Sequence, residues 1–400
     1  MKNTESEKVN ILIWTSSFYP NLGGLQSATN EFANYLKHCQ YNVQVLTNRY
    51  PIKLKEFELI SGIQVNRYLF LSNPYLYLKR KRIDLFFGWF LIKPYTILKL
   101  LFFFLKFKPS IVNIHFPDNQ IFECLFFQKI FKYKIISSFH GNELERIQKN
   151  RTWNFKNLLY HKLLSASDYI TGCSNFILNG IKASFPKVEP KKLKPILNGV
   201  SDQLLNTPLN LNRKDYFFSA SRFIPKKGID LLFKVLLKLT SEKLYLAGGC
   251  KQDIDLMSLK LTSNIEILGK QEFKSIINYL TNAKITLITS KIEPYGIFVA
   301  EAISSGTPLI TTNVGGIPEV IALATLNLTT EEKKLFYLWV KIVDPKVESF
   351  LSAIREINSN EESSYKDFLK VINKIRPNFF WNDRLKIYGE QVQELIKSKN

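Results

Sequence analysis

The sequence predicts an α/β protein with two doubly wound domains, each a parallel sheet covered by helices on both faces. The length of 400 residues corresponds to two or three domains of typical size. The chain is 46% hydrophobic and 22% charged, which is enough apolar material for a full core. Short apolar, β-branched runs alternate with helix-spaced segments along the whole chain, a rhythm typical of parallel sheets covered on both sides.

Five short apolar runs predict the strands of the first half, and helical spacing predicts helices between them, for example over 25–37 and 153–164. The predicted strands cover 9–15, 43–47, 111–115, 134–139 and 169–173. The second half repeats the pattern. Its predicted strands cover 216–220, 243–247, 265–268, 285–289 and 308–311, and its predicted helices cover 228–239, 272–282 and 298–304.

Charge is distributed unevenly along the chain. The net charge is +21, and the first 200 residues hold 28 Lys and Arg against only 12 Asp and Glu. Such basicity points to a polyanionic neighbour, either nucleic acid or an anionic membrane surface. No recognisable nucleic-acid module is present, so the prediction is a membrane surface and no nucleic-acid partner.

The segment 75–108 is set apart by its composition. The basic cluster 79–82 precedes an almost unbroken apolar run over 85–105, which Lys93 and Lys99 interrupt. A narrow polar stripe would run along this helix, formed by Thr96, Lys99 and Lys106. An amphipathic helix in the membrane interface fits this pattern best. A buried crossover helix and a membrane-spanning helix remain open, because about 20 apolar residues suffice to span.

The four cysteines and the polar start of the chain bear on the compartment. Cys39, Cys124, Cys173 and Cys250 form no CxxC pair, so neither a zinc ribbon nor a disulfide framework is expected. No secretory signal pattern opens the sequence. We therefore expect a cytoplasmic protein, bound peripherally to the inner face of the cell membrane.

The first candidate ligand loop follows the first predicted strand. Gly23 and Gly24 lie between that strand and a helix, where backbone N–H groups can approach an anion. The loop is neither GxGxxG nor a P-loop, and a simple tight turn is the alternative.

Two loops of the second half carry more specific chemistry. Arg222 and Lys227 follow a predicted strand at its carboxyl end, and two cations on one short loop suit a diphosphate. A solvated basic loop is the alternative there. Further on, Glu293 precedes a proline and Gly296 opens a helix that carries Glu301. Two carboxylates flanking a helix N-terminus could hold the hydroxyls of a sugar nucleotide around its phosphates.

In combination these motifs resemble the retaining glycosyltransferases of family 4, which have the GT-B fold. The resemblance includes Phe139–Glu143 (FHGNE) and Asn198-Gly199-Val200, covers most of the chain and is strongest over 216–319. It implies a first domain over 1–205 on the acceptor side and a nucleotide-sugar domain over 212–376, with a cleft between them. A closing helix over 377–400 would cross back onto the first domain.

The resemblance also implies roles for individual residues. The implied catalytic residues are His140 and Glu293, and the implied donor-binding residues are Gly23, Gly24, Arg222, Lys227, Gly296, Ile297, Phe298 and Glu301. Family members usually need no metal or other cofactor and keep the anomeric configuration. One departure is the stretch 322–338, which lacks the glycines common there in the family.

The resulting prediction is a hexosyltransferase that uses a UDP- or GDP-sugar. Its expected acceptor is a lipid-linked glycan, in cell-surface polysaccharide or lipopolysaccharide biosynthesis. The alternative is an inactive GT-B-like scaffold that binds a membrane or a partner; an epimerase or phosphorylase of the same fold is a further rival. Asp253 and Asp255 match a DxD metal motif, but two carboxylates alone rarely hold a divalent ion. His115, at a strand end, is a secondary candidate.

Overall fold

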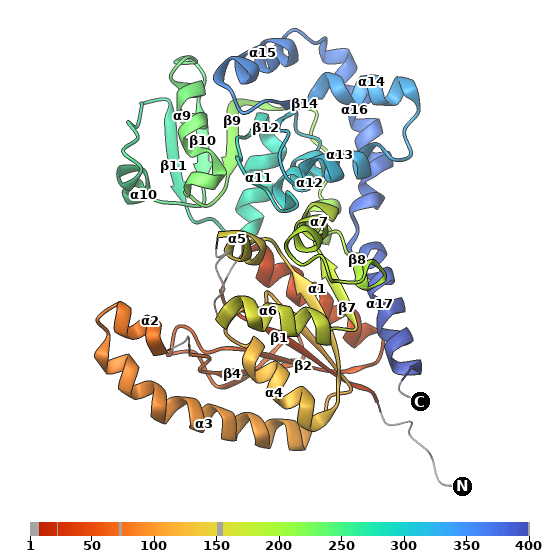
Figure 1. Cartoon of the computed structure of the whole chain (residues 1–400). Helices are drawn as coiled ribbons and strands as arrows, with labels where there is room; N and C mark the ends of the chain where they lie inside the picture. The colour runs from red at the N-terminus through yellow and green to blue at the C-terminus, as the bar shows by residue number, and fades with distance from the viewer. Residues whose placement is uncertain (1–7, 22, 72–73, 150–154, 399–400) are drawn as a thin grey trace. The chain divides into compact units, whose positions relative to one another are not determined.

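The computed structural model describes residues 8–21, 23–71, 74–149 and 155–398 (Figure 1). Its backbone contacts divide the chain into two compact units. The first unit comprises Met1–Leu197 together with Leu385–Asn400, and the second comprises Asn198–Arg384. Each unit is built around one sheet.

The first unit holds an eight-stranded sheet in the order β3-β4-β2-β1-β5-β6-β7-β8. Its strands are β1 (Asn10–Thr15), β2 (Asn42–Asn48), β3 (Phe57–Ile60), β4 (Ile63–Tyr68), β5 (Ile111–His115), β6 (Lys134–Phe139), β7 (Tyr169–Gly172) and β8 (Leu193–Pro195). All neighbours are parallel except β3 and β4. That hairpin departs from the all-parallel prediction. Ser61 and Gly62 make its turn with φ of 50° and 69°, the positive values that a tight two-residue hairpin requires.

Helices cover both faces of this sheet. They are α1 (Gly24–His38), α2 (Pro74–Lys79), α3 (Ile83–Phe107), α4 (Ile121–Phe131), α5 (Asn142–Lys149), α6 (Phe155–Ala166) and α7 (Asn175–Ser184), with the short turn η1 (Pro190–Lys192). Side chains alternate between the two faces of a strand. The ring of Phe104 in α3 lies 5.9 Å from Trp14, whereas the ring of Phe32 in α1 lies 4.9 Å from His115, on the opposite face. α3, α4 and α6 follow one another along the Trp14 face (Figure 1).

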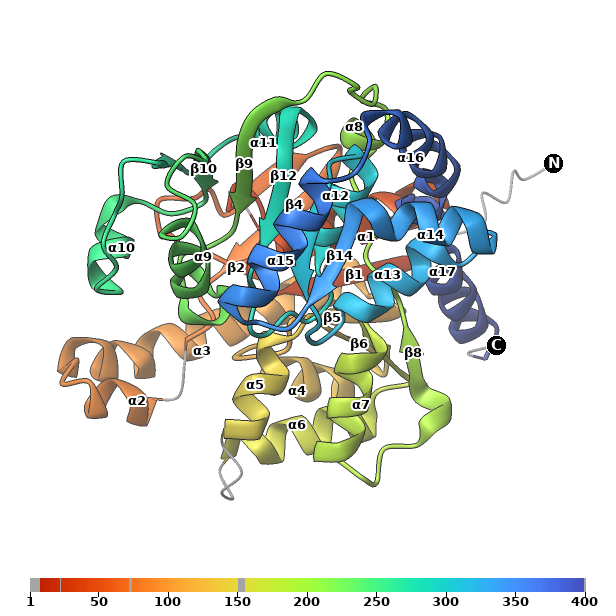
Figure 2. The ribbon, with the colours of Figure 1, turned by 90° about the horizontal axis from the view of Figure 1, so that it is seen from above.

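The second unit holds a parallel sheet in the order β11-β10-β9-β12-β13-β14, with β9 and β12 at its centre (Figure 2). Its strands are β9 (Lys214–Ala220), β10 (Leu244–Ala247), β11 (Ile265–Gly269), β12 (Ala283–Ile288), β13 (Leu309–Thr312) and β14 (Val340–Val343). Its helices are α8 (Asp202–Leu205), α9 (Ile229–Leu236), α10 (Lys251–Leu256), α11 (Phe273–Asn282), α12 (Ile297–Ser305), α13 (Ile317–Thr325), α14 (Thr330–Trp339), α15 (Val347–Asn358) and α16 (Glu362–Ile375), with the turns η2 (Pro225–Lys227) and η3 (Arg376–Phe379). The glycine-free stretch thus forms the end of α13 and most of α14.

The closing helix α17 (Trp381–Lys397) carries the chain back into the first unit from Leu385 onward. There the Asn113 amide donates a hydrogen bond to the Tyr388 hydroxyl at 2.9 Å, and the Tyr388 ring lies 4.7 Å from Phe32. Tyr388 is fully buried. These contacts confirm the predicted return of the last helix, and the two doubly wound units confirm the predicted fold class.

Three polar side chains of the long helix α3 point toward the protein, whereas Lys106, the last member of the predicted polar stripe, is exposed. Lys93 forms a buried ion pair with Glu123 of α4, Thr96 donates to the Leu69 carbonyl at 3.2 Å, and Lys99 pairs with Glu56 at 2.8 Å. The opposite side is apolar and exposed. Its members are Ile83, Phe87, Phe90, Leu91, Tyr95, Leu98, Phe102 and Leu105, which we call the α3 face.

No helix within the described ranges is both long and apolar enough to span a bilayer. Of the three alternatives for 85–105, the spanning one therefore finds no support in the described residues. A fully buried crossover helix is excluded by the exposure of the α3 face.

Candidate active site

The carboxyl edge of the second sheet brings together two loops that lie far apart in the sequence. Lys227, in the turn after β9, forms an ion pair with Glu293, in the loop after β12. The Ser290 hydroxyl donates a further hydrogen bond to the same carboxylate oxygen at 3.1 Å. The side chains of Lys227 and Glu293 are only 18% and 13% exposed, so water screens their attraction weakly. The two loops therefore present one shared charged site.

Two glycines allow close backbone approach here, Gly228 between the loops after β9 and β12 and Gly315 between the loops after β12 and β13. Gly228 has φ +67°, and a Cβ there would lie 1.8 Å from the Thr289 carbonyl oxygen. Gly315 has φ +59°, and a Cβ there would lie 2.0 Å from the Glu293 carbonyl oxygen. Only glycine combines that backbone conformation with that lack of volume. Gly315 was not predicted as a site residue, although the Gly-Gly pair after a strand was a usable signal.

The N-terminus of α12 adds positive potential to the same edge. Gly296 caps the helix with φ +104°, and Ile297 and Phe298 supply its first N–H groups. The first N–H groups of any helix lack intrahelical acceptors and carry the positive end of the helix dipole. Arg222 is exposed at the end of β9. Together with Lys227, these groups could bind a diphosphate.

Glu301 lies on α12 in the turn that follows this N-terminus. Its side chain is partly exposed, and burial among neighbouring protein atoms raises its pKa to about 8. It makes no hydrogen bond to any residue in the described ranges of the chain. A carboxyl group that is largely protonated at neutral pH can both donate to and accept from a hydroxyl, which is compatible with the predicted ribose contact.

In the first unit, two histidines end neighbouring parallel strands. His115 ends β5 and His140 follows β6, with Nδ1 of His115 and Nε2 of His140 3.0 Å apart and the rings stacked at 5.2 Å. Burial lowers the pKa of His140 to about 4, and burial together with the neighbouring His140 holds the pKa of His115 well below its usual range. Both rings are therefore neutral at pH 7, where one nitrogen donates and the other accepts.

Glu143 holds the turn that carries His140. Its carboxylate accepts hydrogen bonds from the backbone N–H of His140 at 3.0 Å and of Gly141 at 2.8 Å. Gly141 has φ +121°, which favours glycine. Burial raises the pKa of Glu143 to about 7 in spite of these hydrogen bonds. Sequence reasoning placed Glu143 in the motif but assigned it no role.

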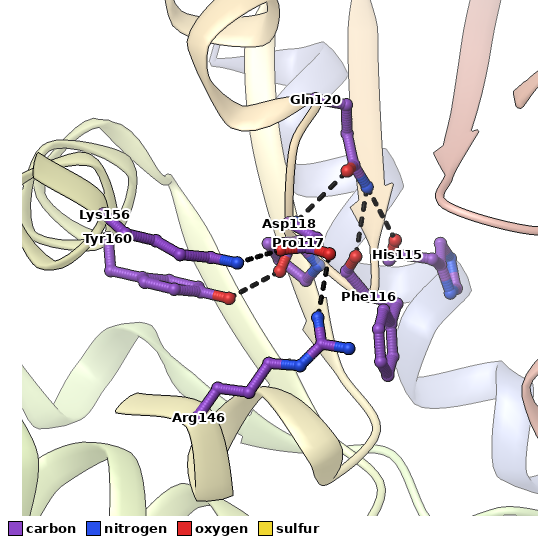
Figure 3. A network of polar contacts seen from close by, with 8 residues as sticks. All are labelled: His115, Phe116, Pro117, Asp118, Gln120, Arg146, Lys156 and Tyr160. Atoms are coloured by element: carbon purple, nitrogen blue, oxygen red, sulfur yellow. Dashed lines mark hydrogen bonds and ion pairs between the residues drawn. The ribbon is translucent and has the colours of Figure 1, made fainter. Parts of the chain in front are cut away.

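The loop between β5 and α4 is fixed by a polar network that sequence reasoning missed (Figure 3). Asp118 accepts a hydrogen bond from Arg146 at 2.8 Å and pairs with Lys156, while the Tyr160 hydroxyl donates to the Pro117 carbonyl at 2.7 Å. Arg146 comes from α5, and Lys156 and Tyr160 come from α6. A carboxylate soon after an apolar strand was the available signal, as for Glu293. The network anchors the carboxyl end of β5, and thus His115, to two helices.

Gly23 and Gly24 lie exposed where α1 begins. Gly23 has φ 160°, extended backbone that any residue adopts, and a Cβ there would meet only the flexible Gln26 side chain at 2.8 Å. The Ser17 hydroxyl accepts hydrogen bonds from Gln26 at 2.9 Å and Asn21 at 3.2 Å, which shape the loop. The geometry leaves room for an anion but does not itself require glycine at Gly23.

Asp253, from the DxD pattern, stabilises the start of helix α10. Its carboxylate accepts a hydrogen bond from the Cys250 backbone N–H at 2.8 Å and so caps α10. Among the residues that the structure describes, no group of three His, Cys, Asp or Glu side chains is arranged to hold a metal.

Two doubly wound units on one chain are the architecture of the GT-B fold. Comparison with protein-family models identifies the family to which the chain belongs. Residues 22–204 match Glycosyltransferase Family 4, and residues 205–370 match Glycosyl transferases group 1. The chain belongs to glycosyltransferase family 4.

Relatives share moderate identity with the chain. One of them, a component of the human phosphatidylinositol N-acetylglucosaminyltransferase, is 25% identical over 329 residues, which cover 78% of this chain and 63% of the human protein. The match thus spans less than two thirds of that relative's length. The N-acetyl-alpha-D-glucosaminyl L-malate synthase of Bacillus anthracis is 22% identical over 329 residues, covering 76% of this chain and 79% of the synthase.

Solved structures show the same fold at low identity. Sucrose-phosphate synthase from Thermosynechococcus elongatus superimposes with a TM-score of 0.70 at 15% identity, covering 98% of this chain and 100% of that chain. Anabaena HepE, in complex with UDP and glucose, gives a TM-score of 0.69 at 13% identity, covering 96% and 99%. These likenesses confirm the GT-B fold.

Proposed function

We propose that the protein is a retaining hexosyltransferase that takes its sugar from a UDP- or GDP-linked donor. The observation that carries the proposal is the site formed by Lys227, Glu293 and the N-terminus of α12 at one sheet edge. Membership of glycosyltransferase family 4 supports it, and so does the UDP bound in the structurally similar HepE.

In this proposal each group of the second unit meets a different part of the donor. Arg222 and Lys227 neutralise the diphosphate, and Glu293 accepts hydrogen bonds from sugar hydroxyls beside the N–H groups of Gly296 and Phe298. Glu301 takes the ribose. Because fixed cations and helix N–H groups supply the positive charge, transfer proceeds without a metal ion or other cofactor.

The proposed chemistry transfers the sugar with retention. The bond from the anomeric carbon to the diphosphate oxygen breaks as the acceptor oxygen bonds to that carbon on the same face. The acceptor hydroxyl proton passes to the departing phosphate oxygen, so charge balances without another base. The neutral His140 acts from the first unit as a hydrogen-bonding partner of the donor sugar.

We place the acceptor on a membrane, as a lipid-linked glycan in a cell-surface polysaccharide or lipopolysaccharide-like pathway. The α3 face supports this, because exposed aromatic and aliphatic side chains beside the basic cluster 79–82 suit an anionic interface. The phosphatidylinositol in the human relative's name is also consistent with a lipid acceptor. The corresponding location is the cytoplasmic face of the cell membrane.

The donor site is tested by thermal shift with UDP, GDP, ADP and their sugar conjugates, with and without EDTA. A ligand at 100 times its Kd stabilises the folded protein by about 2.7 kcal/mol. We expect one base to give a clear shift that EDTA leaves unchanged. No shift with any of them, in folded protein, would favour the scaffold alternative, and a shift abolished by EDTA would overturn metal independence.

Glu293→Gln is the matching variant, with Glu319→Gln, on α13, as its control. Glu293→Gln keeps the side-chain volume but removes the negative charge that pairs with Lys227 and accepts hydrogen bonds from the sugar hydroxyls. We expect transfer to fall at least 100-fold, within the range for loss of a transition-state contact, while the fold remains intact. Transfer at the wild-type rate would refute the role assigned to Glu293.

A further inference from the structure

An apolar groove of about 620 Å³ lies between α4 and α6 on the outer side of the first unit. Its apolar lining consists of Phe122, Leu125, Phe126, Phe155, Leu158 and Leu159. Lys129 and Lys162 also line it and are exposed. A water-filled apolar groove of this size is costly, and it matches the volume of ordinary small-molecule sites.

The groove lies on a helix that packs beside α3. α4 packs against both α3 and α6, and all three helices lie on the same side of the sheet (Figure 1). α4 exposes Phe122, Phe126 and Ile130, which are spaced one helical turn apart and so share its outer face. Lys93 of α3 lies 5.6 Å from the Phe122 ring, which joins the two helices at this point. Neighbouring helices α3 and α4 therefore both expose apolar side chains, those of α4 at the groove itself.

One end of the groove lies near the histidine pair. α4 begins directly after the loop that follows His115, so Phe122 is close to the carboxyl edge of the sheet. Phe155 opens α6 next to Lys156, whose side chain pairs with Asp118 of the same loop (Figure 3). From this end the groove extends along both helices toward Lys129 and Lys162, away from the carboxyl edge.

We propose that this groove binds one hydrocarbon chain of an anionic membrane lipid, with the head group at the rim lysines Lys129 and Lys162. The inference rests on the proposed function, which places the acceptor on a membrane. The apolar walls favour binding of the hydrocarbon chain, since each buried CH₂ contributes about 0.8 kcal/mol to the free energy of binding. The rim lysines Lys129 and Lys162 complement an anionic head group, which a partner protein's apolar helix would not need.

The test is photo-crosslinking of the full-length protein on vesicles. Phosphatidylcholine vesicles with about 30% phosphatidylglycerol, an anionic surface, receive a trace of phosphatidylglycerol that carries a diazirine near its chain end, and labelled peptides are mapped by mass spectrometry. We expect label on α4 and α6. Replacing the label by its phosphatidylcholine analogue should reduce this labelling.

Two variants distinguish lipid binding in the groove from vesicle binding by the surface around it. Leu125→Ser/Leu158→Ser should lower α4 and α6 labelling on the order of tenfold, because polar walls hold the chain poorly, while vesicle co-sedimentation stays unchanged. The control Phe102→Ser, on the α3 face, should weaken co-sedimentation but keep labelling per bound molecule. Label confined to α3, or labelling that the groove variant leaves unchanged, would overturn the proposal.

The donor-nucleotide thermal shift on the same samples keeps the two proposals distinguishable. Groove labelling without any nucleotide shift would refute the proposed transferase and leave a lipid site. A nucleotide shift without groove labelling would refute the lipid groove and leave the transferase.

Discussion

Glu301 is a carboxyl group whose pKa of about 8 lies far above the value of about 4.3 expected in an unfolded chain. Between those two values the folded protein holds a proton that the unfolded chain has released. The contribution of Glu301 to stability is therefore fully present below pH 4 and is lost as pH rises toward 8, by up to about 1.4 kcal/mol per pH unit.

Glu301→Gln removes this titration, so its free energy of unfolding should fall less than that of the wild type between pH 5 and pH 8. Urea denaturation at pH 5, 6.5 and 8 measures it. Glu143→Gln is a poor control, since burial also raises the pKa of Glu143. Glu319→Gln, at the start of α13, is the better control. Parallel pH profiles for wild type and Glu301→Gln would contradict the burial of this carboxyl.

His115 acts on His140 through the 3.0 Å contact between their ring nitrogens. His115→Phe keeps an aromatic ring against Phe32 and removes the nitrogen that fixes the tautomer of His140. We expect kcat to fall about two- to tenfold, the worth of one hydrogen bond, with KM nearly unchanged. Steady-state kinetics from pH 5 to 8 check this. A change in KM alone, or unchanged kinetics, would make His115 merely structural.

Whether the sequence could predict a site residue depended on the kind of contact that the residue makes. Lys227 and Glu293 were predictable because each follows a strand, and the topology of a doubly wound sheet brings strand ends together. Glu143 and Asp118 could not be predicted, because they act through backbone hydrogen bonds and ion pairs whose partners become neighbours only in the folded chain.

At the scale of the element, α3 shows what periodicity can and cannot predict. The sequence indicated an amphipathic helix, but spacing alone does not tell which face a neighbouring element covers. In the structure Lys93 and Thr96 face inward, because α4 and the Leu69 carbonyl offer them partners. The exposed side is therefore the apolar one.

Substitutions at Phe102 and Phe104 of α3 should affect different properties, vesicle binding for Phe102 and stability for Phe104. Phe102→Ser/Leu105→Ser should release the protein from phosphatidylglycerol-containing vesicles, by about tenfold or more in partition, without loss of stability. Phe104 is fully buried and stacks on Phe127 at 4.8 Å. Phe104→Ala should therefore cost about 3–5 kcal/mol of stability. Co-sedimentation and urea denaturation measure the two effects, and unchanged co-sedimentation of the double variant would exclude the α3 face as a membrane contact.

At the scale of the whole molecule, the alternation of strands and helices was enough to predict two doubly wound units, because unbroken apolar strands need cover on both faces. β3 escaped prediction because it is only four residues long, partly exposed and at the sheet edge. β4 escaped it because its buried side chains include Asn66 and Arg67, so no apolar run marks the strand. The helices α13 and α14 occupy a stretch for which composition gave no turn signal. Thr329 and Glu332 mark the boundary through a capping box instead.

The return of α17 makes the first unit depend on the last residues of the chain. Tyr388 is fully buried there against Phe32 and Asn113. Tyr388→Ala leaves a cavity and an unpaired amide, so we expect the first unit to lose about 3–5 kcal/mol of stability. Tyr388→Phe keeps the ring and should cost only about 1 kcal/mol.

Hydrogen exchange followed by mass spectrometry resolves this loss by unit. Faster exchange should appear in α1 and β5, which carry the Tyr388 partners Phe32 and Asn113, while β9, β12 and β13 of the second unit keep their protection. The nucleotide thermal shift should persist in Tyr388→Ala, because the groups proposed to bind the diphosphate and the ribose, Arg222, Lys227 and Glu301, belong to the second unit. Equal loss of protection in both sheets would instead mean that the two units unfold as one cooperative body, and α17 would then stabilise the donor site as well.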